Sequence, residues 1–386
     1  MTPTTIIMKE SSQLDIFAAG ADLKNTFCFV KQNQLICSEQ IGDLEDAAVY
    51  HHYIESIRNL RKLYEVKPKI VVCDLHPGYL STQYALSMPA IETIQVQHHW
   101  AHIASVLVEH GLEGPVIGLA CDGTGYGTDG AIWGCECLIA SLEKFERFGH
   151  LAYYQLAGAD KASKEAIRPL LGLLKKTYGE GFKLHKFSWL LDRIEPDRNE
   201  KSEIGNLKSE IILEQIDKRL NTVETSSLGR VFDAVAAMVG LGSFNHTDAQ
   251  LPIALEEIVG NEIEEHYDFE LVKRTDKPLQ FDLSKMIKQL ITDIQVKKAA
   301  GVISAKFHNT LANGLFGMAE QARESTKLDT VALSGGVFCN RYLTNRLIKL
   351  LKENDFCVLF NGDVPSNDGG ISIGQAAIAA KIVSNG

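Results

Sequence analysis

Three of the twelve histidines lie within five residues, in the segment HHWAH at positions 98–102. His98 and His102 are four residues apart, so on a helix both side chains project from one face and can bind one metal ion through imidazole nitrogens. His99 would point elsewhere. A surface run of histidines, or buried histidines that hydrogen-bond to carbonyl groups, would give the same spacing, so the spacing alone leaves these alternatives open.

Two aspartates stand at positions where α/β sheets bind ligands. Asp122 follows an apolar stretch at residues 115–120, and Asp368 lies in the loop SNDGG at 366–370, ahead of a predicted helix. Ligands of open α/β sheets bind at the carboxyl ends of strands. Two histidines and two aspartates that leave coordination positions open suit iron, manganese or zinc. Both aspartates also adjoin glycine, as turn-forming aspartates often do, and position alone does not decide between a ligand and a turn.

Three loops of small residues are candidates for phosphate binding, at 20–26, 122–127 and 334–340. Glycine lets backbone amides approach phosphate oxygens, Lys24 can add charge, and Thr124 can add a hydroxyl donor. Each loop alone is more readily explained as a tight turn, but two of them open the two halves of an apparent duplication, which favours a nucleotide cleft. The sequence has no GxxxxGK[ST] motif, and we identify no serine, cysteine or threonine nucleophile in a recognisable elbow. We therefore expect group transfer directed by a metal and a bound phosphate, without a covalent enzyme intermediate.

The elements that must position these residues occur in a repeated order. Residues 14–39 are predicted to form three strands and 46–65 a helix, and short strands at 70–73 and 93–96 lead into the histidine segment. The order of strand, small-residue turn and strand then starts again at residue 115. We predict a duplicated, two-lobed α/β architecture with a central cleft. Its parts are an N-terminal lobe at 1–112 and a C-terminal lobe at 113–386, with a helical insertion at about 160–320 and a polar surface excursion at 193–210.

The composition excludes several classes of protein. The 386 residues are 45% hydrophobic and 23% charged, which excludes a disordered or collagen-like chain. Acidic residues outnumber basic ones by 49 to 39, a net charge of −10, so we do not expect a nucleic-acid partner. The eight cysteines form no CxxC pair, and the sequence shows neither a signal peptide nor an 18-residue apolar run. We expect a cytoplasmic protein with free thiols and no membrane partner.

Taken together, these motifs resemble the carbamoyltransferase region of the HypF hydrogenase maturation proteins. They follow the family's order over nearly the whole chain, from about residue 14 to 380. The segments that carry the resemblance are GADLKNTFC (20–28), IGDLED (41–46), CDLHPGYLST (73–82), VQHHWAHIASV (96–106), CDGTGYGTDGAIWGCE (121–136), GRVFDAVAAMVGL (229–241), KFHNTLA (306–312), ALSGGVFCNRYL (332–343) and PSNDGGISIGQAA (365–377).

The resemblance implies a two-lobed, actin-like and Hsp70-like ATPase (ASKHA) fold, similar to the enzymes that transfer threonylcarbamoyl to tRNA. It implies that one metal ion is bound by His98, His102, Asp122 and Asp368, and that Lys24, His98, His102 and Asp122 are catalytic. It also implies a nucleotide-binding surface formed by Lys24, Asn25, Thr26, Gly123, Thr124, Gly125, Gly127, Asp233, Gly335, Gly336 and Asn340.

The implied reaction is transfer of a carbamoyl group from carbamoyl adenylate to the C-terminal cysteine thiol of a HypE-like protein, in the synthesis of hydrogenase cyanide ligands. The implied cofactors are a divalent metal, iron or zinc, and ATP, AMP or carbamoyl adenylate, with magnesium as a further option. The motifs of the family's adenylate-forming region are not found in this sequence, so a separate adenylate-forming domain or protein is expected. Two alternatives stay open: a carbamoyltransferase acting on a small molecule or tRNA, and a nucleotide- and metal-binding assembly subunit without transfer activity.

Overall fold

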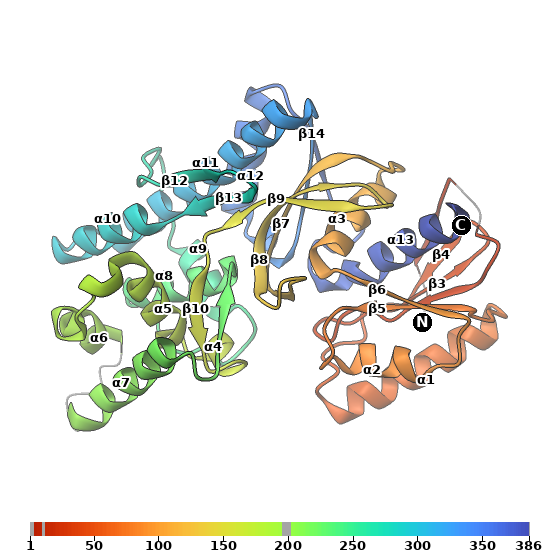
Figure 1. Cartoon of the computed structure of the whole chain (residues 1–386), viewed down its shortest axis with the longest axis horizontal. Coiled ribbons are helices and arrows are strands. Elements are labelled where there is room, and N and C mark those ends of the chain that lie inside the picture. The colour runs from red at the N-terminus through yellow and green to blue at the C-terminus, as the bar shows by residue number, and fades with distance from the viewer. Residues whose placement is uncertain (1–3, 10–11, 195–201, 386) are drawn as a thin grey trace.

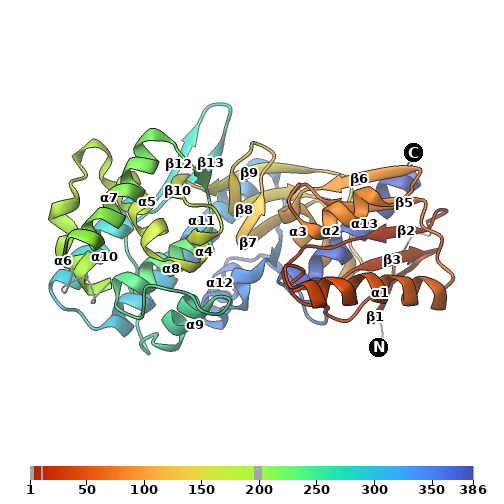
Figure 2. The ribbon, with the colours of Figure 1, turned by 90° about the horizontal axis from the view of Figure 1, so that it is seen from below.

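Two β-sheets with a layer of helices between them organise the molecule (Figure 1). The structure is a computed structural model that describes residues 4–9, 12–194 and 202–385. Figure 2 shows the first sheet at one end of the molecule and the helix-rich part at the other. None of the helices in the described ranges is long and apolar enough to cross a lipid bilayer.

The first sheet has the strand order β1-β4-β3-β2-β5-β6. The pairs from β1 to β2 are antiparallel, whereas β2–β5 and β5–β6 are parallel. Its strands are β1 (Thr4–Ile7), β2 (Ile16–Ala18), β3 (Cys28–Lys31), β4 (Gln34–Cys37), β5 (Ile70–Asp74) and β6 (Glu92–Val96).

Alternate residues of these strands belong to two separate cores. Phe17 and Val71 pack with helices α1 (Ala47–Leu63) and α2 (Leu80–Ser87), whereas Ile16 and Val72 pack with helix α13 (Ile371–Asn385) on the opposite face. Side chains of a strand alternate between the faces of its sheet, so a strand that is apolar throughout must be covered on both sides. The segment IVVCD of β5 is such a strand, and all five of its residues are buried.

The second sheet repeats the order of the first. In the series β9-β8-β7-β14-β15, two antiparallel pairs are followed by two parallel pairs, as in β4-β3-β2-β5-β6. The predicted duplication is therefore present in the strand order. The strands are β7 (Val116–Tyr126), β8 (Ile132–Ala140), β9 (Phe145–Leu151), β14 (Thr330–Ser334) and β15 (Cys357–Phe360), and β12 (Glu270–Arg274) and β13 (Lys277–Asp282) extend the edge beside β9.

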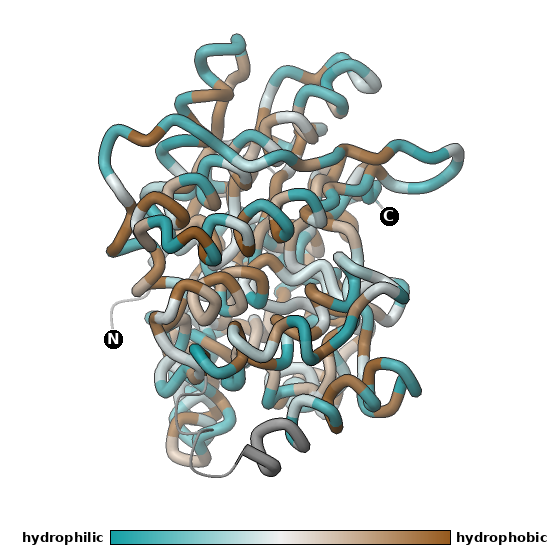
Figure 3. The backbone as a smooth tube through the Cα atoms, turned by 90° about the vertical axis from the view of Figure 1, so that its left-hand side faces the viewer, coloured by the Kyte–Doolittle hydropathy of each residue, from teal (hydrophilic) through white to brown (hydrophobic). Residues whose placement is uncertain are grey.

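The helix-rich part covers the far face of the second sheet. Figure 3 shows hydrophilic and hydrophobic residues alternating along these helices, as expected where one side of a helix packs on a core. Residues 195–201 of the predicted surface excursion lie outside the described ranges. The elements are α4 (Lys161–Lys164), α5 (Ile167–Tyr178), η1 (Gly179–Gly181), η2 (Leu184–Phe187), α6 (Ser188–Ile194), α7 (Ser202–Lys218), α8 (Leu228–Met238), α9 (Gln250–Glu257), α10 (Ser284–Gln295), α11 (Ala300–Thr326) and α12 (Arg341–Glu353), with strands β10 (Tyr154–Ala157) and β11 (Thr222–Thr225) paired beside them.

Helices α3 (His98–Glu109) and α13 form the layer between the sheets. Helix α3 follows the last strand of the first sheet but packs on β7, β8 and β14 of the second, and α13 follows the last strand of the second sheet but packs on the first. The two helices are so close that a Cβ on Gly374 would lie 1.9 Å from the carbonyl oxygen of Ala101. The lobe boundary at residue 112 stays a prediction, and α13 belongs spatially with the first sheet.

Two local predictions are wrong. The glycine-rich stretch 122–127 is predicted to be a loop, but strand β7 continues to Tyr126 through a register shift between Cys121 and Gly125. The expectation of free thiols fails for Cys28 and Cys37, which form a disulfide. These two residues face each other in the β3–β4 hairpin with their Cα atoms 4.2 Å apart, whereas the other six cysteines are free.

The contact between α3 and α13 predicts a stability effect. Gly374→Ala should lower the free energy of unfolding by about 1–3 kcal/mol, because the added methyl group would push α13 away from α3. Urea denaturation measures this change. The matched control is Gly181→Ala, since an added Cβ at exposed Gly181 meets nothing within 4 Å. Equal unfolding free energies for both variants would contradict the close contact.

Candidate metal centre

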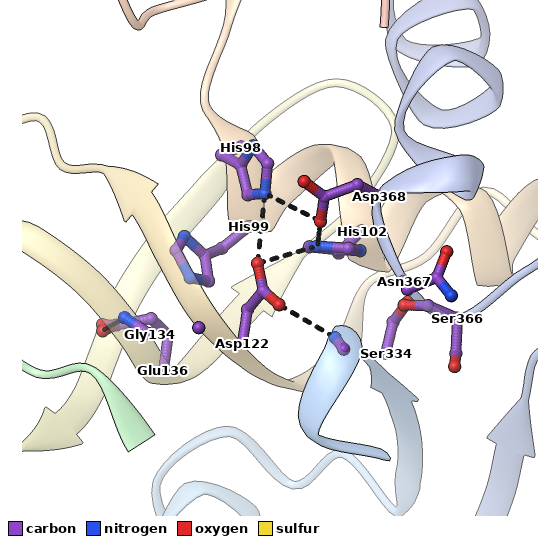
Figure 4. A network of polar contacts seen from close by, with 12 residues as sticks. His98, His99, His102, Asp122, Gly134, Glu136, Ser334, Ser366, Asn367 and Asp368 are labelled. Carbon is purple, nitrogen blue, oxygen red and sulfur yellow. Dashed lines mark hydrogen bonds and ion pairs between the residues drawn. The ribbon is translucent and has the colours of Figure 1, made fainter. Parts of the chain in front are cut away.

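Four side chains converge between the two sheets (Figure 4). Nε2 of His98 lies 3.4 Å from Oδ2 of Asp122 and 3.8 Å from Oδ1 of Asp368. Nε2 of His102 lies 3.7 Å and 3.8 Å from the same two oxygens. One ligand atom from each residue lies within 4.8 Å of every other, so the arrangement brings together the four residues that the sequence pattern selected.

Three elements supply these side chains. Helix α3 begins at His98, where the side-chain oxygen of Gln97 caps it by accepting a hydrogen bond from the backbone N–H of Trp100. The four-residue spacing then places His102 on the same face, one turn further on. Asp122 lies in the register shift of β7, where a bulge can re-aim a side chain toward a site. Asp368 begins η5 (Asp368–Gly370), directly before α13.

The donor set suits a divalent metal ion. Both histidine side chains are fully buried, and the aspartate side chains are 10% and 13% exposed. Within the described part of the chain, Nε2 of neither His98 nor His102 makes a hydrogen bond. Buried polar atoms nearly always make hydrogen bonds, so two nitrogens that lack a hydrogen bond and face two carboxylates fit the coordination of an ion.

The electrostatics of the group are complementary. Burial lowers the pKa of His98, but Asp74, Asp122 and Asp368 outweigh burial and raise this pKa well above its ordinary value. Burial favours a raised pKa for Asp122, but His102 and His98 hold it well below the usual range. Positive charge is therefore stabilised at the place where a cation would bind.

One backbone hydrogen bond holds Asp122, and nearby glycines let the backbone approach the candidate site. Its Oδ1 accepts a hydrogen bond of 3.0 Å from the backbone N–H of Gly336, which leaves Oδ2 facing the histidines. The preceding Gly335 has φ +108°, and a Cβ there would lie 2.1 Å from the carbonyl oxygen of Cys121. At Gly125 a Cβ would lie within 2.8 Å of both His98 and His99. These glycines allow the backbone to pass close to the candidate ligands.

The loop that carries Asp368 is attached to the helix that carries the histidines. Glu109, the last residue of α3, accepts hydrogen bonds through Oε1 from three successive backbone N–H groups, those of Gly362, Asp363 and Val364. Its Oε2 accepts a further bond of 3.1 Å from the side chain of Asn361. Sequence reasoning missed Glu109, because its partners lie more than 250 residues away along the chain.

Asp74 is the second residue that sequence reasoning missed. It ends strand β5, is fully buried, and its Oδ2 lies 2.8 Å from Nδ1 of His98. The one feature of the sequence that could have indicated Asp74 is its position at the end of an apolar strand. His99, as predicted, is outside the group of four; its Nδ1 lies 3.2 Å from the side-chain amide of Gln97, and its ring lies beside Trp133.

The first predicted phosphate loop contains one half-buried residue and two internal ones. The half-buried Lys24 forms an ion pair with Asp248. Burial would lower the pKa of Lys24, but Asp248, with smaller contributions from Asp368 and Asp122, raises it. The side chains of Asn25 and Thr26 are internal: Asn25 donates to the carbonyl of Ala19, and Thr26 donates to that of Gly369.

The other predicted nucleotide residues also differ in their surroundings. Gly123 has open space around its Cα, and its neighbour Thr124 is half-buried. Gly127 packs against Trp133. Asp233 is buried between Arg230 and Asn245, and burial raises its pKa although Arg230 acts against this. Asn340 caps α12 through Leu343 and donates to His308.

Comparisons with known proteins identify the family. Residues 11–109 match the HypF Kae1-like domain, and residues 118–375 match the second subdomain of the carbamoyltransferase Kae1-like domain. Carbamoyltransferase HypF of Synechocystis sp. is 37% identical over 98% of this chain and 49% of its own length. A carbamoyltransferase HypF homolog of Cupriavidus necator is 33% identical over 96% of this chain and 93% of its own length. The chain thus spans about half the length of the Synechocystis relative.

Solved structures agree with this match. The crystal structure of full-length HypF in the phosphate- and nucleotide-bound form has a TM-score of 0.90 and 42% identity, over 98% of this chain and 57% of that one. The crystal structure of T. kodakarensis HypF has a TM-score of 0.87 and 30% identity, over 100% of this chain and 50% of that one. The predicted fold class is therefore confirmed. On these grounds the chain belongs to the HypF carbamoyltransferase family, in which it corresponds to the Kae1-like region.

Proposed function

We propose that this chain transfers a carbamoyl group from carbamoyl adenylate to the C-terminal cysteine thiol of a HypE-like protein, in the synthesis of the cyanide ligands of hydrogenase. One observation carries the proposal: four candidate ligand atoms of two histidines and two aspartates meet within 4.8 Å in a buried site. Membership of the HypF family supports the carbamoyl chemistry.

His98, His102, Asp122 and Asp368 would bind one divalent ion, iron or zinc. When bound, such an ion supplies Lewis-acid polarisation of a carbonyl or phosphate oxygen. The chain's own groups would orient the donor. Lys24 would attract the phosphate of the adenylate. The backbone at Gly123, which has open space beside its Cα, and the half-buried hydroxyl of Thr124 would approach the phosphate.

In the proposed reaction the acceptor thiolate forms a C–S bond to the carbamoyl carbon, the bond from that carbon to the phosphate oxygen breaks, and AMP leaves. The thiol proton goes to solvent or to a base on the acceptor, since the thiolate is the nucleophile. Positive charge at Lys24 stabilises the phosphate as it departs. Asn25, Thr26, Asp233 and Asn340 would act on the nucleotide indirectly, because their side chains bind other parts of the protein.

The metal centre predicts a loss of bound metal on removal of its histidines. The variant His98→Ala plus His102→Ala should retain less than a tenth of the wild-type metal content, because only two carboxylates remain to hold the ion. Elemental analysis of the purified protein measures this. The control is His51→Ala plus His52→Ala, which removes two adjacent exposed histidines from α1. Full metal content in the first variant would rule out the site.

The proposed role of Lys24 predicts that its removal changes the affinity for nucleotide but not the metal content. Lys24→Ala should weaken AMP binding by about 10- to 100-fold, the range expected for one charge-assisted hydrogen bond to phosphate, and leave metal content unchanged. Isothermal titration calorimetry with AMP measures the affinity. Lys62→Ala, at an exposed position of α1, is the control. Unchanged AMP affinity in Lys24→Ala would mean that another group binds the phosphate.

The transfer reaction can be tested by mass spectrometry. Incubation of this chain with carbamoyl adenylate and a HypE-like acceptor should add about 43 Da to the acceptor, as expected for a carbamoyl group that replaces the thiol hydrogen. The acceptor with its terminal cysteine changed to alanine should gain nothing. Modification of tRNA or of a small hydroxyl compound in place of the protein would contradict the proposed acceptor. AMP binding without any transfer would instead support an assembly subunit.

A further inference from the structure

Asp74 makes contacts that the proposed reaction leaves unexplained. It is fully buried, and each carboxylate oxygen accepts one hydrogen bond. Oδ2 accepts a bond of 2.8 Å from Nδ1 of His98, and Oδ1 accepts one of 2.9 Å from the backbone N–H of His76. Burial of an unpaired carboxylate is costly, so the hydrogen bonds to both oxygens of Asp74 are what allow it to be buried at this position.

Strand register explains why Asp74 meets His98. In the parallel pair of β5 and β6, Asp74 lies opposite Val96, two residues before α3 begins at His98. The end of one strand therefore lies under the first turn of the helix that follows its neighbour. The contact is built from the last two strands of the first sheet and the first residue of α3, and no loop residue takes part in it.

The hydrogen bond to Asp74 decides which nitrogen of His98 can bind metal. A carboxylate can only accept, so the hydrogen of this bond is on Nδ1 of His98. Nε2 is then available as a ligand and faces Asp122 and Asp368 at 3.4 Å and 3.8 Å. His102 differs, since neither of its ring nitrogens has a hydrogen-bond partner among the described residues. Only one of the two histidines is oriented in this way.

We propose that Asp74 is the positioning residue of the metal centre: it holds His98 with its Nδ1 protonated and its Nε2 directed at the ion. This inference rests on the metal site proposed above. Asp74 also joins that site to the segment His76–Tyr79, because it binds the backbone N–H of His76, and the His76 ring stacks on Tyr79 at 4.2 Å between centroids. Carboxylates that bind the second nitrogen of a ligating histidine fix its ring and raise its basicity.

The substitution Asp74→Asn separates this role from simple packing. The new side chain has nearly the same shape, and its oxygen must stay with the backbone N–H of His76, which needs an acceptor. Its NH₂ group then faces Nδ1 of His98, so Nδ1 must accept and the ring hydrogen moves to Nε2. The lone pair that would bind the ion is thereby lost, although no ligand has been removed.

The test is a titration of the metal-free full chain with Co²⁺, followed by visible absorption. Asp74→Asn should bind Co²⁺ about 10- to 100-fold more weakly than wild type, the usual cost of losing such a partner, and with an altered d–d spectrum. The far-ultraviolet circular dichroism should not change. The control is Asp293→Asn, which alters another buried carboxylate, paired with Lys298 and Lys306 outside the metal centre. Its Co²⁺ affinity should equal that of wild type.

Wild-type affinity and spectrum in Asp74→Asn would overturn the role of Asp74 while leaving the metal site intact. A wild-type chain that binds no Co²⁺ would overturn the metal site itself, and this inference with it. If Asp74→Asn does not fold, nitrogen-15 NMR of the zinc-loaded wild-type chain replaces the titration. The expected result is a protonated Nδ1 on His98 with a slowly exchanging, hydrogen-bonded hydrogen. Ligation of zinc through Nδ1 would contradict the proposal.

Discussion

The close packing of α3 on α13 is the contact on which the candidate site depends. The two helices approach most closely at Gly374, where there is no room for a side chain next to the carbonyl oxygen of Ala101. Helix α3 carries His98 and His102, and Asp368 stands directly before α13. One helix–helix distance therefore positions three of the four candidate ligands. The fourth, Asp122, is added from β7, on which α3 packs.

The duplication explains why such a contact exists. Each half ends its sheet with a helix, and each of these helices lies on the sheet of the other half. The two halves are thereby joined through a shared layer, and the ligands come from both. Glu109 and Asp74 add to this arrangement at opposite ends of α3. Glu109 ties the last residue of α3 to the loop of Asp368, and Asp74 ties the first sheet to His98, the first residue of α3. The proposed carbamoyl transfer uses a site whose geometry is thus set by the interior of the fold.

The sequence was sufficient to predict the candidate ligands but not their support. His98 and His102 could be found because helical periodicity is local. Asp122 could be found because it follows an apolar stretch, and Asp368 because it lies in a loop ahead of a predicted helix. Asp74 required the register of β5 against β6, and Glu109 required a contact with a loop some 250 residues away. The stretch after Cys121 was misread because its glycines suggested a turn, whereas they allow a strand to pass close to His98 and Trp133. The pairing of Cys28 with Cys37 likewise depended on hairpin register.

The central claim is that one ion is held jointly by the two halves of the chain. Anomalous diffraction from crystals of the metal-loaded protein, recorded on both sides of the absorption edge of the bound metal, tests it most directly. The account predicts one strong peak at about 2.0–2.2 Å from Nε2 of His98, Nε2 of His102 and a carboxylate oxygen of each of Asp122 and Asp368. A peak bound by residues of one half alone, or by cysteines elsewhere in the chain, would contradict it.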